Sequence, residues 1–149
     1  TMANADAEGS IINDMVEKYA LKNPTRVKVC ESLGKTRYLS VMRLASAVLG
    51  NSSSGLLEAP EFKIPTVNIG NRQKGRTRAT SVIDVDNSYL AIKNGVEKAI
   101  SKSFRDSLIS TINPYSTIDG KPSEKILDEI KKQLDKGIDL KKRFYNIEF

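Results

Sequence analysis

The segment AVLGNSSSGLLEAPEFKIPTVNIGNRQKGRTR, residues 47–78, decides how the rest of the chain can fold. Its pattern predicts a short apolar strand at 47–49, a polar turn at 50–55, a short helix that carries Glu58, and a second strand at 66–69. A small polar turn between a strand and a helix exposes backbone N–H groups at the positive end of the helix dipole, which favours phosphate or another anion. Ser, Asn and Gly are also ordinary capping and turn residues, so plain helix capping is the alternative.

The loop that follows the second strand carries positive charge without compensation. No acidic residue occurs from 62 to 83, and the same stretch holds five cations: Lys63, Arg72, Lys74, Arg76 and Arg78. These cations strengthen the preference for a small polyanion. A solvated surface loop is the alternative.

The remainder of the chain alternates predicted strands and helices. The sequence predicts the tail of a strand that ends at Asn4 and further strands at 27–30 and 81–85. Apolar periodicity predicts the intervening helices, one at 36–45 and one that Asn87 or Ser88 caps and that runs to about Ile100. This alternation predicts an α/β fold: a Rossmann-like, mainly parallel sheet with helices on both faces. Ligands of such sheets bind beyond the carboxyl ends of the strands. Four polar turns are expected to converge there, at 4–6, 32–34, 50–54 and 70–76.

Two further helices are predicted near the ends of the chain. Ser10 is expected to cap the first, whose apolar residues form one face, and Ser123 to begin the last, whose apolar residues are expected to lie inside. These residues are Ile11, Ile12, Met15, Val16 and Tyr19 in the first helix and Ile126, Leu127, Ile130 and Leu134 in the last.

Composition is ordinary for a soluble globular protein. The 149 residues are 39% hydrophobic and 28% charged, and no run approaches the ~18 apolar residues that suggest a membrane span. The single cysteine, Cys30, can form neither a disulfide framework nor a metal cluster, and is expected at a buried strand position. We therefore expect a cytoplasmic protein without a membrane partner, metal or cofactor. The net charge of +6 leaves a nucleic-acid-binding module as an alternative, although the aromatic-studded platform that single strands need is missing from the sequence.

The amino-acid sequences of several motifs resemble those of one enzyme family. GNSSSGLLEAP (50–60), IPTVNIGNRQKGR (64–76) and SVIDV (81–85) are similar to the C-terminal half of the UDP-N-acetylglucosamine 2-epimerases, in particular their hydrolysing branch. ANADAEGSIIN (3–13) and NPY (113–115) also resemble that family. The resemblance implies the C-terminal half of a two-domain, glycosyltransferase-B-like architecture. It also implies the conversion of UDP-N-acetylglucosamine and water to N-acetylmannosamine and UDP, in sialic-acid-type sugar biosynthesis.

The same resemblance implies roles for individual residues in binding UDP or a UDP-sugar. Ser52 and Ser53 would hold the diphosphate, and Glu58 would contact the ribose hydroxyls. Arg72 would approach the nucleotide, Leu33 would lie near uracil and Asn4 would point toward the sugar. Gln73 and Arg76 match the family motif in the loop after the second strand.

The resemblance also implies where the chemistry lies. The family's catalytic carboxylates come from an N-terminal domain and a histidine assists, whereas this sequence contains no histidine. We therefore expect a fragment that is inactive alone and lacks its N-terminal domain. An incomplete UDP-binding domain would span 1–120, and a terminal helix and tail at 121–149 would cross to the missing domain. A homo-oligomer is possible in this family.

Three alternatives remain at this point. Relatives within the family hydrolyse a UDP-2,4-diacetamido-2,4,6-trideoxy sugar. The C-terminal half binds the UDP that this sugar nucleotide shares with UDP-N-acetylglucosamine, so its sequence does not distinguish the two substrates. A glycosyltransferase of the two-Rossmann type would use the same fold half. A nucleic-acid-binding module would bind duplexes with a steep dependence on salt.

Overall fold

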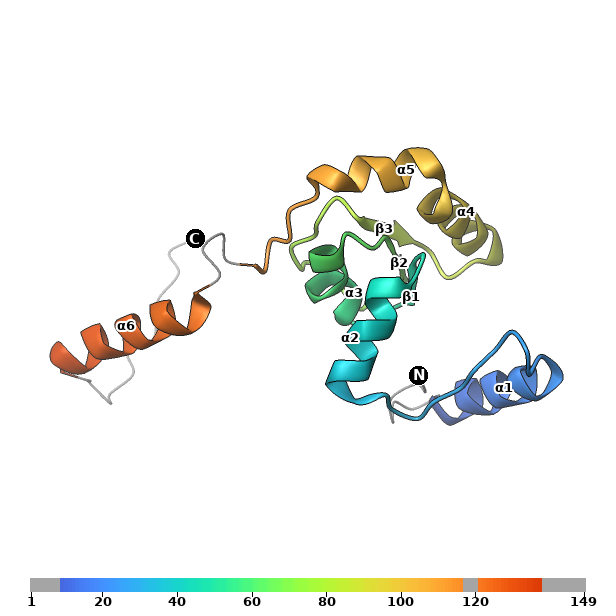
Figure 1. The fold of residues 1–149 in the computed structure, drawn as a ribbon, viewed down its shortest axis with the longest axis horizontal. Coiled ribbons are helices and arrows are strands. Elements are labelled where there is room, and N and C mark those ends of the chain that lie inside the picture. Colours follow the sequence, from blue (N-terminus) through green and yellow to red (C-terminus); the bar gives the residue numbers. More distant parts are fainter. Residues whose placement is uncertain (1–8, 117–120, 138–149) are drawn as a thin grey trace, which may run out of the picture. The chain divides into compact units, whose positions relative to one another are not determined.

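A three-stranded parallel sheet organises the first part of the chain (Figure 1). In the computed structural model, which describes residues 9–116 and 121–137, the strand order is β1-β2-β3. The strands are β1 (Val48–Gly50), β2 (Thr66–Ile69) and β3 (Val82–Val85). Thr66 in the central strand pairs with Val48 on one side and Val82 on the other. The predicted strands at 47–49, 66–69 and 81–85 are confirmed to within a residue.

Helices connect and flank these strands. They are α1 (Gly9–Lys22), α2 (Gly34–Leu44), α3 (Ser54–Leu57), α4 (Tyr89–Ile100), α5 (Lys102–Ser107) and α6 (Pro122–Asp135), with 3₁₀ segments η1 (Ala59–Phe62) and η2 (Leu108–Ser110). The chain divides into two units, residues 1–113 and 114–149, and α6 is the described helix of the second. No helix within 9–116 or 121–137 has the length and apolar content needed to cross a bilayer.

Close approaches at two glycines show that helices cover both faces of the sheet, as predicted. A Cβ atom at Gly95 in α4 would lie 3.0 Å from Val67 Cγ1, and one at Gly55 in α3 would lie 2.4 Å from Thr66 Cγ2. Thr66 and Val67 are consecutive in β2, so their side chains point to opposite faces. The helices α3 and α4 therefore pack on opposite faces, and Leu56, Val67 and Ala99 between them are fully buried.

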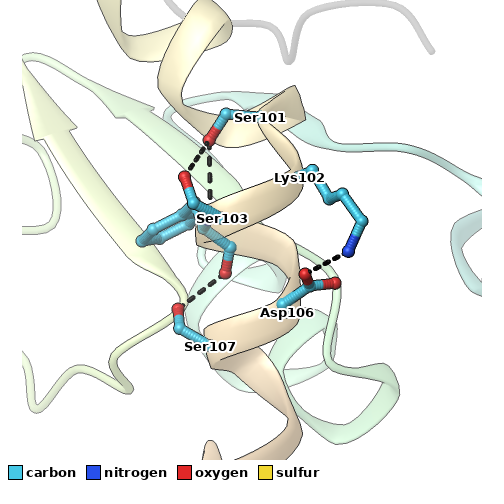
Figure 2. A network of polar contacts seen from close by, with 6 residues as sticks. Ser101, Lys102, Ser103, Asp106 and Ser107 are labelled. Carbon is cyan, nitrogen blue, oxygen red and sulfur yellow. Dashed lines mark hydrogen bonds and ion pairs between the residues drawn. The ribbon is translucent and has the colours of Figure 1, made fainter.

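Helix α5, which the sequence pattern did not predict, follows α4 through a single residue (Figure 2). Ser101 ends α4, where its Oγ donates to the Lys98 carbonyl at 2.7 Å, and begins α5, where the same oxygen accepts from the Phe104 amide at 3.3 Å. An ion pair joins Lys102 and Asp106 along the exposed side of α5. Serine is common in loops as well as at helix caps, so the pattern around Ser101 does not by itself indicate a helix start.

The predicted strand at 27–30 is wrong. Residues 27–30 are irregular, and they pair with no strand in the described part of the chain. Alternating β-branched residues favour a pleated backbone, but a strand forms only where a neighbouring strand completes the hydrogen-bond ladder. Cys30 is consequently half-buried rather than buried in a sheet. The predicted strand ending at Asn4 lies outside the described residues.

The apolar faces of the first and last helices are exposed. In α6, Ile126, Leu127, Ile130 and Leu134 are each at least half exposed, so the expectation that they lie inside is wrong for the described residues. The apolar residues of α1 are exposed as well. Helical periodicity predicts which residues share a face, but it does not supply the surface that covers that face.

Candidate functional site

Polar loops meet at the carboxyl edge of the sheet, where an α/β fold binds its ligands. Residues 50–55, defined here as the serine turn, run from the last residue of β1 into the start of α3, and residues 70–78, defined here as the basic loop, follow β2. Gln73 in the basic loop is buried, and its Nε2 donates to the Asn51 carbonyl in the serine turn at 2.7 Å. The predicted convergence of these two turns is therefore confirmed.

A pocket of about 520 Å³ lies between the start of α2 and the serine turn. It brings together Leu33 and Ser52, two of the residues predicted to bind a nucleotide. The full lining consists of Glu31, Ser32, Leu33, Gly34, Lys35, Tyr38, Val48, Leu49, Gly50, Ser52, Ser54 and Thr66. Apolar side chains and hydroxyl groups thus face one another across a space large enough for a small ligand. The turn at 32–34 reaches this edge even though residues 27–30 form no strand.

The serine turn has fewer free backbone amides than the sequence predicts. Helix α3 has only four residues, so its dipole is small, and the amides of Gly55, Leu56 and Leu57 already donate to carbonyls of Ser52 and Ser53. Ser54 donates its amide to Ser52 Oγ at 3.3 Å. Within the described part of the chain, the amides of Ser52 and Ser53 have no such partner. An anion at this turn would therefore contact the hydroxyls and amides of these two residues rather than a helix end.

Tyr38 is a site residue that the sequence pattern did not single out for function. It lies one turn into α2, lines the pocket, and its hydroxyl is 2.8 Å from Ser54 Oγ. The contact joins α2 to the serine turn across sixteen residues of sequence. A hydroxyl–hydroxyl contact between segments this far apart leaves no local signal in the sequence.

The Tyr38→Phe variant is expected to lose about 0.5–1.5 kcal/mol of unfolding free energy, because the half-buried Ser54 hydroxyl loses its partner. Urea denaturation measures this loss. Tyr89→Phe is the matched control, since Tyr89 is 81% exposed, and no change is expected there. Equal losses in the two variants would contradict a specific role for the Tyr38–Ser54 contact.

Glu58 lies at the end of α3 rather than inside it. It is half-buried, and its Oε2 atom is buried and has no hydrogen-bond partner within the described residues. Buried carboxylate oxygens are normally satisfied by a donor, so an unpaired oxygen is consistent with a donor supplied by a ligand. Glu58 does not line the pocket that holds Leu33 and Ser52. Its predicted contact with ribose hydroxyls stays a prediction.

The basic loop places three predicted residues in different settings. Arg72 and Arg76 are exposed, whereas Gln73 is buried against the serine turn. Ser53, the remaining predicted residue of the serine turn, is half-buried at the start of α3. The roles of these four residues in ligand binding remain predictions. Asn4 lies outside the described residues.

A three-stranded parallel sheet with helices on both faces defines an α/β, Rossmann-like domain. The family model described as UDP-N-acetylglucosamine 2-epimerase matches residues 1–131. The chain belongs to this family.

Similar proteins include three from bacteria. The chain is 45% identical over 107 residues to the GDP/UDP-N,N'-diacetylbacillosamine 2-epimerase (hydrolyzing) of Campylobacter jejuni, an alignment that covers 72% of this chain and 27% of that protein. It is 35% identical over 128 residues to the UDP-N,N'-diacetylbacillosamine 2-epimerase (hydrolyzing) of Legionella pneumophila, covering 86% and 32%. It is 38% identical over 113 residues to the polysialic acid biosynthesis protein P7 of Escherichia coli, covering 76% and 28%. The chain thus matches about a quarter to a third of the length of these relatives.

Proposed function

We propose that this chain is the UDP-binding part of a hydrolysing UDP-sugar 2-epimerase. The observation that carries the proposal is the pocket that joins Leu33 to Ser52, with Gln73 holding the basic loop against the same turn. Family membership supports a 2-epimerase rather than a glycosyltransferase of similar fold. The names of two relatives support the hydrolysing reaction.

In the proposed reaction, this chain holds the nucleotide while the bond to UDP breaks. The proton at C2 of the sugar is removed, UDP leaves, and water adds to the glycal intermediate. We place the acids and bases for these steps on a preceding domain. The relatives are long enough to contain one, because this chain matches only 27% and 32% of their lengths. Ser52 and Ser53 would contact the diphosphate, which leaves as UDP, so their hydrogen bonds would strengthen as negative charge develops there.

Two sugars are candidates for the substrate. The relatives from C. jejuni and L. pneumophila favour UDP-N,N'-diacetylbacillosamine, a diacetamido-trideoxy sugar. The relative from E. coli, named for polysialic acid biosynthesis, favours UDP-N-acetylglucosamine, the substrate that the sequence motifs predict. Product analysis of an enzyme that contains this chain, with each sugar nucleotide supplied separately, distinguishes them.

Thermal unfolding in the presence of UDP tests the proposed function. A ligand that binds only the folded state stabilises it by about 2.7 kcal/mol at a hundredfold excess over its Kd, so the melting temperature should rise with UDP concentration. UMP and inorganic phosphate would show which part of the nucleotide contributes, and GDP would test the base, because one relative is named for both nucleotides. Duplex DNA is the negative control. Stabilisation by DNA and none by UDP would contradict the proposal.

A further inference from the structure

A polar pair joins two neighbouring strands of the sheet. Asn68 in β2 and Asp84 in β3 are register partners, and Asn68 Nδ2 donates to Asp84 Oδ1 at 2.7 Å. Asn68 is 1% exposed, on the face of β2 that also carries Thr66 and packs against α3. An apolar residue would be the ordinary choice at the buried position of Asn68, because burying a polar group costs free energy, whereas the side chain of Asp84 is 47% exposed. The pair therefore calls for an explanation beyond packing.

Arg78 extends this pair into the basic loop. Its Nε lies 2.8 Å from Asp84 Oδ2, and its two terminal nitrogens donate to the carbonyls of Arg76 at 3.0 Å and Gln73 at 3.1 Å. The two terminal nitrogens are thus hydrogen-bonded, whereas the contact between Nε and Asp84 is an ion pair without hydrogen-bond geometry. One side chain fastens both ends of the segment 73–76 to the sheet.

Gln73 completes the connection to the serine turn. It is 4% exposed, its carbonyl accepts from Arg78, and its side chain donates to the Asn51 carbonyl. Asn51 directly precedes Ser52. Contacts therefore run without a break from the interior of the sheet, through Asp84, Arg78 and Gln73, to the residue before the pocket-lining serine.

We propose that Arg78 and Asp84 are positioning residues: they fix Gln73, and through it the serine turn, in the geometry that holds the nucleotide. This inference rests on the proposed function, because it assigns these residues to the same site. Neither residue lines the pocket, so both act through Gln73 rather than by contact with ligand. The Lys102–Asp106 pair on α5 offers a contrast, since both side chains are more than half exposed and the pair spans one turn of a helix.

A double-mutant cycle tests whether Arg78 acts through Gln73. Arg78→Lys keeps the positive charge but loses the planar guanidinium group with its several N–H donors. Gln73→Met keeps the side-chain volume but loses the hydrogen bond to the Asn51 carbonyl. Each is expected to weaken UDP binding about tenfold, measured by calorimetry well below the melting temperature. The double variant should also show about a tenfold loss rather than a hundredfold one, because residues in one network are not additive. A hundredfold loss, or a lowered melting temperature with unchanged affinity, would overturn the proposal.

Limited digestion with trypsin provides a test that does not need UDP. Arg72 and Lys74 are cleavage sites within the basic loop, and both Arg78→Lys and Gln73→Met should speed cleavage there severalfold in the unliganded protein. Asp84→Asn, which keeps an acceptor for Asn68 but loses the ion pair, should do the same and serves if Arg78→Lys fails to fold. Asp106→Asn is the matched control and should cleave like the wild type.

These two experiments separate the inference from the proposed function. If the wild-type chain binds no UDP, the proposed function fails. The rate of tryptic cleavage then decides by itself whether Arg78 and Asp84 fix the basic loop in place. Cleavage that is unchanged in all three variants would overturn the inference, whatever UDP does.

Discussion

Removing the hydroxyl groups of Ser52 and Ser53 together is expected to weaken UDP binding about a hundredfold or more. Hydrogen bonds to a charged group contribute about 1.5–3 kcal/mol each, and two of them correspond to at least two orders of magnitude in Kd. The fold should survive, because Ser52 Oγ accepts one long bond at 3.3 Å from Ser54 and Ser53 makes no capping bond. Calorimetric titration of Ser52→Ala/Ser53→Ala with UDP measures the change.

The matched control for this variant replaces two serines away from the pocket. Ser107 and Ser110 donate to the carbonyls of Phe104 and Ser107, near the end of α5 and in η2. Ser107→Ala/Ser110→Ala should bind UDP like the wild type. Unchanged affinity in the Ser52→Ala/Ser53→Ala protein would remove the diphosphate from this turn and leave only the fold and the family.

The Gly55→Ala variant is expected to lose about 1–3 kcal/mol of unfolding free energy. The new Cβ would lie 2.4 Å from Thr66 Cγ2, and Thr66 is a β-branched residue that is 2% exposed in the central strand. Its side chain cannot rotate freely, because Thr66 Oγ1 donates to the Gly55 carbonyl at 2.9 Å. The gain in helix propensity from Gly to Ala, about 1 kcal/mol, offsets only part of the strain. Urea denaturation measures the loss.

A second substitution shows whether this clash is the cause. Thr66→Ser removes the methyl group and keeps the hydroxyl, so it should restore most of the stability of Gly55→Ala while lowering that of the wild type. Two losses that simply add would contradict the close approach of α3 to β2.

The sequence predicts local features of this fold better than tertiary ones. Strand β2 has the bounds that its β-branched pattern predicts, and Ser88 caps α4 through the Ala91 amide at 3.3 Å. The cap depends on neighbours in the chain alone, and β2 forms where its pattern predicts because β1 and β3 pair with it. The segment 27–30 has an equally good strand pattern but no partner strand, and the apolar faces of α1 and α6 have no cover in the described residues. The sequence pattern indicates which secondary structure a segment can form, and tertiary packing decides whether that structure forms and is covered.

The same distinction applies to the candidate site. Leu33 and Ser52 were predicted by motif and lie in one pocket, while Gln73 was predicted by motif and proves to bridge two loops. Tyr38 and Asp84 were not predicted to serve the site, because each contacts a partner sixteen residues away in the sequence. Only the folded arrangement brings such pairs together. Glu58, Arg72 and Arg76 remain predictions that ligand binding can test.

The junction at Ser101 has a consequence for the dynamics of the chain. One side chain closes α4 and opens α5, and its own carbonyl accepts from the Arg105 amide at 3.1 Å. Fraying of either helix at this point gives up hydrogen bonds of both. The two helices should therefore open as one cooperative unit in native-state amide exchange, although the hydrogen-bond ladder breaks between them.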